Sequence, residues 1–261
     1  MSGCYARAMP PIRDLGFTSH NILLPDGSET LPGRPLLATD PACAALLRTA
    51  RRLVPPTGAK APRVVDLGCL EGGYAVEFAR AGYDVLGIEV RERNHARCEA
   101  VARELGLPNL RFVRDDARNV AAHGEFDVVL CLGLLYHLDE PASFLRTLGA
   151  RTRSLLLLNT HYATASECRH YALSAPTTHE GRRGRWFEEY TEGLPDASLE
   201  EHAWASFGNP RSFWLEKAAL LATLVESGFP TVLEEFDFLS PLEEKYPLAL
   251  EHQRGLFVAL K

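Results

Sequence analysis

Residues 64–73 read Val64-Val65-Asp66-Leu67-Gly68-Cys69-Leu70-Glu71-Gly72-Gly73. The first four of them predict a short buried strand, because three of the four are apolar and bulky. The glycines that follow predict a tight turn, and residues 74–81 predict a helix that Gly82 ends. A strand, a glycine-rich turn and a helix in this order are typical of an open α/β sheet, which binds its ligands beyond the carboxyl ends of its strands.

The same alternation continues along the chain on both sides of this unit. Further strands are predicted at residues 85–89, 110–113, 126–132 and 155–158, and helices at residues 41–54, 92–105 and 141–149. Short apolar strands that alternate with helices predict a mostly parallel, doubly wound sheet with helices on both faces. The pattern stops at about residue 160 and returns with a predicted helix at residues 212–227 and strands at residues 232–238 and 255–260.

This organisation divides the chain into two parts. Residues 1–60 are expected to be an N-terminal extension with one helix, which Asp40 caps and which Pro41 begins. Within the extension, residues 22–27 predict a short strand that enters a tight turn. Residues 61–261 are expected to be the α/β domain, with an irregular insertion at about residues 160–211. The extension and the insertion are both predicted to form a lid over the carboxyl edge of the sheet.

Composition limits the classes of function. The 261 residues are 46% hydrophobic and 24% charged, which is typical of a globular chain, and the net charge of −6 argues against a general nucleic-acid binder without excluding one. No apolar run is long enough to cross a bilayer, so no membrane partner is expected. The six cysteines contain no C-x-x-C pair, which favours neither a zinc site nor a disulfide framework. A cytoplasmic location is therefore expected, while the oligomeric state is not predicted.

The charges around the glycine-rich turn indicate the kind of ligand. A dinucleotide fingerprint needs a glycine where Leu70 stands, and carboxylates such as Asp66 and Glu71 at a helix N-terminus would repel a pyrophosphate. They suit a cationic ligand that has no phosphate, and S-adenosylmethionine is such a ligand. Glu89 ends the second strand, where a carboxylate accepts hydrogen bonds from ribose hydroxyls. Asp116, in preference to Asp115, is expected to accept a hydrogen bond from the adenine amino group.

Residues 63–160 resemble the class I (Rossmann-like) S-adenosylmethionine-dependent methyltransferases. The resemblance rests on the loop from Asp66 to Gly72, on Glu89, on Asp116-Ala117, and on residues 126–137. It implies a Rossmann-like fold, with Leu70 departing from the commonest glycine of the loop. The cofactor-binding residues that it implies are Asp66, Gly68, Cys69, Leu70, Gly72, Glu89, Asp116, Ala117, Leu132 and Gly133. Two short stretches, residues 133–141 and 209–214, are also similar to the subgroup of tRNA wobble-uridine carboxymethyl transferases.

Three residues near the carboxyl edge are candidates for chemistry. His137 follows the fourth strand and is either a general base, a hydrogen-bonding partner of the substrate, or a packing histidine. His161 follows the fifth strand and is a second candidate, whereas Tyr136 is expected to cover the cofactor. No metal site is predicted, because the equal spacing of His161, His170 and His179 suits neither one helix face nor a tight loop.

The sequence therefore predicts an enzyme that transfers a methyl group in line from S-adenosylmethionine to a small molecule. A basic run at residues 182–185, next to Trp186, leaves an anionic or aromatic acceptor open and also favours a second reading, an RNA-modifying transferase. Glu188 and Glu189 balance that run if it is only an exposed loop. A third reading is a lyase or cyclase that binds S-adenosylmethionine without methylating an acceptor.

Overall fold

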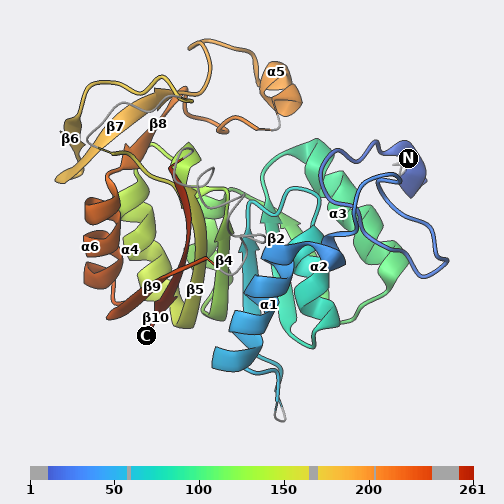
Figure 1. The fold of residues 1–261 in the computed structure, drawn as a ribbon. Coiled ribbons are helices and arrows are strands. Elements are labelled where there is room, and N and C mark those ends of the chain that lie inside the picture. Colours follow the sequence, from blue (N-terminus) through green and yellow to red (C-terminus); the bar gives the residue numbers. More distant parts are fainter. Residues whose placement is uncertain (1–10, 58–59, 165–169, 203, 237–252) are drawn as a thin grey trace, which may run out of the picture.

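A seven-stranded sheet forms the centre of the molecule (Figure 1). The structure, a computed structural model, describes residues 11–57, 60–164, 170–202, 204–236 and 253–261. In the sheet the strands lie in the order β3-β2-β1-β4-β5-β10-β9. Their bounds are β1 Arg63–Leu67, β2 Asp84–Glu89, β3 Leu110–Arg114, β4 Phe126–Leu132, β5 Thr152–His161, β9 Thr231–Glu235 and β10 Arg254–Leu260. The first five of these strands in chain order are parallel, as the alternation in the sequence predicts.

Helices cover both faces of this sheet. On one face, α1 (Pro41–Leu53), α2 (Gly73–Arg80) and α3 (Glu92–Leu105) pack their apolar side chains against β1, β2 and β4. On the other face, α4 (Pro141–Arg151) and α6 (Lys217–Glu226) pack against β4, β5 and β10. Burial on both sides explains why the central strands are almost continuously apolar.

The sheet ends with two antiparallel strands. β10 lies between β5 and β9 and runs antiparallel to both. Its first residue, Arg254, therefore pairs with His161, the last residue of β5. A residue near the C-terminus of the chain is thus placed at the same carboxyl edge as the ends of the parallel strands.

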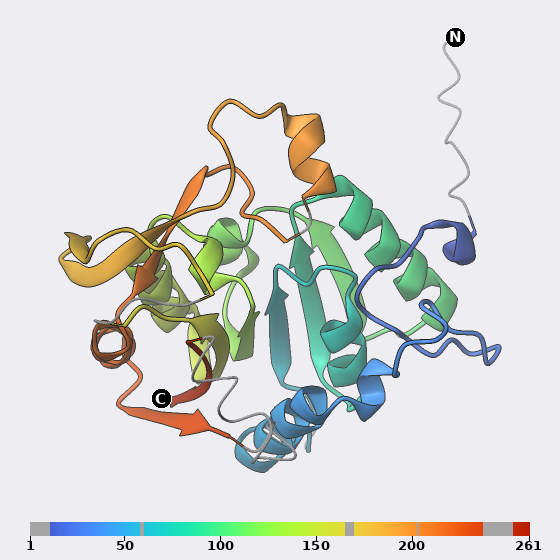
Figure 2. The same cartoon turned by 45° about the horizontal axis from the view of Figure 1, so that its top comes forward.

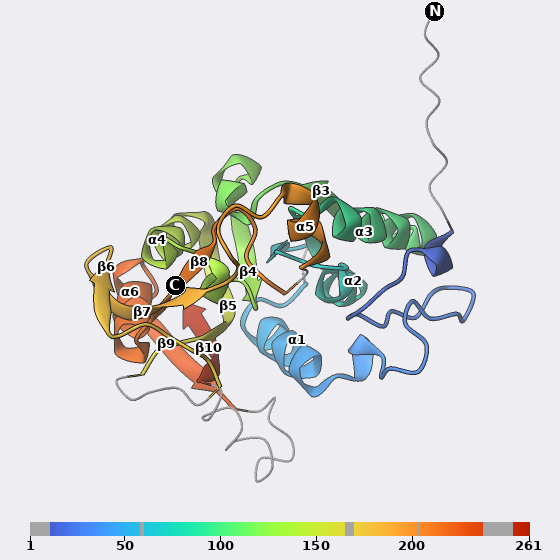
Figure 3. The same cartoon turned by 90° about the horizontal axis from the view of Figure 1, so that it is seen from above.

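The insertion after β5 contains a second, three-stranded antiparallel sheet of β6 (Thr177–His179), β7 (Arg182–Glu188) and β8 (Arg211–Leu215). A short helix, α5 (Asp196–Glu201), lies between β7 and β8. Figures 1 and 2 show the small sheet and α5 above the edge of the main sheet. Seen from above in Figure 3, the small sheet lies on the side of β4 and β5, and α5 lies on the side of β2 and β3.

The helix predicted at residues 212–227 is wrong in part. The helix expected at residues 212–227 begins only at Lys217, because residues 211–215 form β8. Phe213, Trp214 and Leu215 are each at most 3% exposed and pair with β7. A continuous apolar stretch of this length is equally compatible with a strand and with a helix, and pairing with β7 decides between them.

The N-terminal segment has little regular structure before α1. It contains two single turns of 3-10 helix, η1 (Ile12–Asp14) and η2 (Leu37–Thr39), and a bridge between Leu23 and Glu29 in place of the predicted short strand. The cap of α1 is confirmed, since the Asp40 side chain accepts hydrogen bonds from the backbone N–H groups of Ala42 and Cys43. Among the described residues, no helix is long and apolar enough to cross a membrane.

Candidate active site

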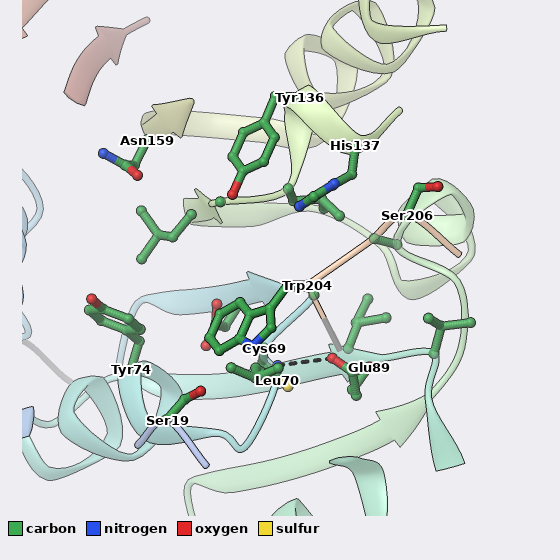
Figure 4. A pocket seen from close by; sticks show the side chains of 18 of the residues that line it. Ser19, Cys69, Leu70, Tyr74, Glu89, Tyr136, His137, Asn159, Trp204 and Ser206 are labelled. Atoms are coloured by element: carbon green, nitrogen blue, oxygen red, sulfur yellow. Dashed lines mark hydrogen bonds between the residues drawn. The ribbon is translucent and has the colours of Figure 1, made fainter. Parts of the chain in front are cut away.

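A cavity of about 910 Å³ lies at the carboxyl edge of the main sheet. All but one of the candidate site residues contribute to its wall, and they come from the ends of β1, β2, β4 and β5 and from the turns that follow β1, β3 and β4. Figure 4 shows Tyr136, His137 and Asn159 on one side of it, and Tyr74, Leu70 and Glu89 on the other. The volume lies within the range of small-molecule sites.

Asp66 and Glu89 place two buried carboxyl groups in one half of the cavity. Burial raises the pKa of Asp66 to about 7, although its carboxylate accepts a hydrogen bond of 3.2 Å from the Ala75 N–H. Burial also raises the pKa of Glu89, against the opposing effect of the backbone N–H groups of Arg91 and Leu70, each 2.9 Å from the carboxylate. A cationic ligand would offset the cost of keeping both groups charged.

Leu70 adopts the backbone conformation of the glycine that it replaces. Its φ is +56°, in the left-handed region that costs a side-chain-bearing residue about 1–2 kcal/mol. The conformation directs its N–H to Glu89 and places Leu70 in the cavity wall. At the position where the family pattern has its commonest glycine, the loop of this chain thus keeps a left-handed residue and adds an apolar side chain to the cavity wall.

Glu71 does not face the cavity, which corrects the expectation that it helps to bind a cation there. Its carboxylate is fully buried and accepts hydrogen bonds from the backbone N–H groups of Thr18, Ser19 and His20, at 2.7, 3.0 and 2.9 Å. It also pairs with Arg97 at 3.1 Å. The Glu71 carboxylate therefore binds the N-terminal segment to the turn. The acidic groups of the cavity considered for a cationic ligand are Asp66 and Glu89.

Gly72 is the one candidate cofactor residue outside the cavity wall. It precedes α2 with a φ of +78°, and a Cβ placed there would lie 2.6 Å from the Phe112 ring. Packing behind the loop therefore accounts for this glycine. Gly68 and Gly133, with φ of +64° and +74°, do line the cavity, as do Cys69, Ala117 and Leu132.

The N-terminal segment reaches the cavity through Ser19, His20 and Leu37. The Nδ1 atom of His20 accepts a hydrogen bond of 3.0 Å from the Gly73 N–H, at the first turn of α2. Burial lowers the pKa of His20 to about 4, against the charges of Glu71 and Asp40. The ring is therefore neutral near pH 7 and adds no positive charge to this wall.

Asp116 lines the cavity, whereas Asp115 does not. The Asp116 carboxylate caps the turn η3 (Ala117–His123) and accepts three hydrogen bonds from the Arg118 guanidinium, the shortest at 2.7 Å. Asp115 instead bonds Asn119 and His123. The preference for Asp116 over Asp115 therefore agrees with the geometry, although part of its hydrogen-bonding capacity is used by Arg118.

Aromatic rings line the other half of the cavity. Tyr136 lies edge-on to His161, with ring centroids 4.6 Å apart, and His161 stacks on Trp214 at 4.8 Å. Tyr171, from the insertion, contacts His161 at 5.0 Å. The guanidinium of Arg254 lies 5.5 Å from the Tyr136 ring centroid and donates a hydrogen bond of 2.8 Å to Asn159. This half is thus apolar and aromatic, with one guanidinium in its wall.

Sequence reasoning missed Glu189, which directly contacts His137. The Nδ1 atom of His137 lies 2.9 and 3.1 Å from the two carboxylate oxygens of Glu189. Glu189 was expected only to balance the basic run, yet its side chain is 1% exposed. No sequence pattern links two residues more than fifty positions apart, so only the fold brings them together.

The basic run itself is largely engaged within the protein. Arg182 pairs with Glu226, and Arg183 pairs with Glu216 at 3.1 Å. Arg185 is 5% exposed. Glu216 and Glu226, and not Glu188 and Glu189, therefore balance the charges of Arg183 and Arg182.

Residues 64–154 match the family model described as a methyltransferase domain. The chain is also 25% identical to the N-terminal domain of EvdMO1, crystallised in the presence of SAH and D-fucose, with a TM-score of 0.66 over 95% of this chain and 92% of that one. Residues 64–154 are therefore similar to a methyltransferase domain, and the fold of the chain agrees with that likeness. A magnesium protoporphyrin IX methyltransferase from Synechocystis PCC 6803, at 15% identity and a TM-score of 0.52 over 86% of this chain and 84% of that one, shares the fold.

Curated sequence relatives are similar to part of this chain. They include ubiquinone biosynthesis O-methyltransferases from Methylococcus capsulatus, 39% identical over 31% of this chain and 35% of the relative, and from Albidiferax ferrireducens, 36% identical over 32% and 34%. The chain thus spans about a third of the length of these curated relatives. The insertion contributes Tyr171 and residues 204–207 to the cavity wall.

Proposed function

We propose that this methyltransferase domain binds S-adenosylmethionine and transfers its methyl group to a small molecule held in the same cavity. The observation that carries the proposal is the single cavity of about 910 Å³ in which an acidic half, with Asp66 and Glu89, adjoins an aromatic half, with Tyr136, His137 and His161. The two carboxylates suit the ammonium and the ribose hydroxyls of the cofactor. The bound SAH and SAM of similar structures support the same ligand.

The residues of this chain mainly orient the cofactor and the acceptor relative to each other. Methyl transfer is an in-line displacement at the sulfonium methyl group, and holding the two reactants in contact can account for a large part of the rate. Glu89 and the Gly68–Leu70 loop fix the cofactor, while the rings of Tyr136 and His161 form the surface against which an acceptor would lie.

An acceptor with an aromatic or an anionic group fits this half of the cavity best. Tyr136, His161 and Tyr171 offer aromatic contacts, and Arg254 offers a guanidinium for a negative group. Ser19, His20 and Leu37 from the N-terminal segment, with residues 204–207 from the insertion, complete the wall. These two segments together act as the lid that excludes water from the reaction.

Two measurements test the proposal. Calorimetry should detect binding of S-adenosylmethionine and SAH, and little or no binding of NAD. Glu89→Gln should weaken SAH binding about ten- to hundredfold, because charge-assisted hydrogen bonds are worth about 1.5–3 kcal/mol. Incubation with methyl-labelled cofactor and a cell metabolite extract should then label a small molecule. Label found only in RNA, or cofactor consumed without label transfer, would instead support one of the two other readings of the sequence.

A further inference from the structure

Glu189 holds His137 from a position just beyond β7. Besides the His137 ring, its carboxylate accepts a hydrogen bond of 2.7 Å from the Ser212 hydroxyl and one of 3.1 Å from the Ser206 N–H. These donors come from β8 and from the loop before it. Glu189 is therefore fixed from several directions in a site with almost no contact with solvent.

The insertion also fixes the backbone of the turn that carries His137. The Asn209 side-chain amide donates a hydrogen bond of 2.9 Å to the His137 carbonyl, and the Phe213 N–H donates one of 2.9 Å to the carbonyl of Leu138. Backbone and ring of His137 are thus both set by residues of the insertion. These contacts fix the orientation of the His137 ring, which favours a role in the site over packing alone.

The contact with Glu189 decides which ring nitrogen of His137 carries a proton. A carboxylate can only accept at Nδ1, so Nδ1 is the donor, and in the neutral ring Nε2 carries the lone pair. Because Nδ1 is engaged and His137 lines the cavity, Nε2 is the nitrogen available to an acceptor there. The arrangement is that of a base oriented by a second, buried group.

We infer that Glu189 is the positioning residue of a His137 general base, and that the acceptor group is a hydroxyl. This inference rests on the proposed function. A hydroxyl is the acceptor that needs such a base, since phenols have a pKa of about 10 and keep their proton near pH 7. A carboxylate acceptor is already ionised, and a neutral amine attacks through its lone pair before it loses a proton.

The step balances without a further reactant. The acceptor O–H bond breaks as its proton passes to Nε2 of His137, and the acceptor oxygen forms a bond to the methyl carbon. The carbon–sulfur bond breaks, and its electron pair returns to sulfur, which turns the sulfonium into a neutral thioether. The imidazolium, next to the Glu189 carboxylate, then releases its proton to water.

The first test needs no acceptor. In ¹⁵N NMR spectra of the full chain with SAH, the His137 ring should show a protonated Nδ1 and an unprotonated Nε2 near pH 7, with the resonances assigned from a His137→Gln sample. An Nε2-protonated ring would overturn the inference, because no lone pair would then face the cavity.

The second test uses ¹³C-methyl-labelled cofactor with the metabolite extract. The labelled methyl carbon should resonate as an O-methyl group. Glu189→Gln should lower kcat about ten- to hundredfold and keep the affinity for SAH within twofold. His137→Ala should lower kcat about a hundredfold or more. Glu189→Asp should recover part of the loss. Glu188→Gln, one residue away and exposed, is the matched control and should leave kcat unchanged.

The outcomes separate this inference from the proposed function. If the wild-type chain labels no acceptor, the proposed function fails, and the NMR result still decides the state of His137. If the label appears on nitrogen, sulfur or carbon, or if Glu189→Gln keeps full turnover, methyl transfer stands and the Glu189–His137 assignment is wrong.

Discussion

Asp66 is a carboxyl group whose protonation state is set by burial. Its pKa, raised to about 7, means that the ligand-free protein carries a mixture of both forms near neutral pH. An ammonium group placed beside it favours the charged form. Cofactor binding and proton release at this residue are therefore coupled.

This coupling predicts a pH dependence with a definite sign. S-adenosylmethionine and SAH should bind more weakly as pH falls below about 7, and binding near pH 7 should release protons, since the ammonium displaces the Asp66 proton. Calorimetry in buffers of different ionisation enthalpy measures the released protons directly. Asp66→Asn should abolish the release, and equal proton release in the two proteins would show that another group is responsible.

In the ligand-free protein, the contribution of Asp66 to the free energy of unfolding should fall as pH rises, whereas cofactor affinity should increase with pH. Because the folded pKa lies above the unfolded value, protonated Asp66 favours the folded state, and that contribution is lost as pH rises from about 4 through about 7. The free energy of unfolding of Asp66→Asn should lack this component of the pH dependence.

Gly72 allows a matched comparison with Gly106. Both have positive φ, at +78° and +58°, but a Cβ at Gly72 would meet Phe112 and Cys98, while a Cβ at Gly106 meets nothing within 4 Å. Gly106→Ala should cost about 1–2 kcal/mol from backbone strain alone, and Gly72→Ala about 2–5 kcal/mol from strain plus overpacking. Urea unfolding measures both, and equal losses would refute the packing role of Gly72.

At the scale of elements, the N-terminal segment is joined to the glycine-rich turn through Glu71. A single carboxylate satisfies three consecutive backbone N–H groups, those of Thr18, Ser19 and His20, and pairs with Arg97. The turn and the segment therefore depend on each other, and removal of the whole segment would disturb the cofactor loop as well as the lid.

Glu71→Gln should accordingly destabilise the protein by about 3–5 kcal/mol, since it leaves Arg97 buried without its partner charge. Glu92→Gln is the control, because its pair with Arg114 is exposed and should be worth at most about 1 kcal/mol. Unfolding by urea, followed by far-UV circular dichroism, compares them. A loss no larger than that of the control would mean that hydrogen bonds other than those of Glu71 hold the segment.

At the scale of the whole molecule, the main sheet and the insertion with its small sheet carry different parts of the site. The main sheet holds the cofactor loop and Glu89. The insertion places Glu189, just beyond β7, against His137, which follows β4, and Ser212 of β8 donates a hydrogen bond to Glu189. The cavity lies at the carboxyl edge of the main sheet, and Tyr171 and residues 204–207 of the insertion complete its wall. Changes in the insertion can therefore alter the acceptor while the cofactor half stays the same.

The amino-acid sequence alone was sufficient for the main sheet and for most of the cofactor half. The strands of the main sheet are covered on both faces, so they appear in the sequence as short apolar runs. The glycines of residues 64–73 mark the turn after the first of these strands. Leu70 could be recognised as a departure, but its left-handed backbone is a property of the folded loop.

Only the tertiary structure decided the roles of Glu71, β8 and Glu189. Glu71 is adjacent to the cofactor loop in sequence but binds a segment fifty residues earlier, and residues 211–215 become a strand because β7 lies beside them. Glu189 reaches His137 because the insertion folds back over β4. Hydrogen bonds and strand pairs between distant residues leave no periodic trace in the sequence, so His137 and His161 could be named from it but their partners Glu189 and Tyr171 could not.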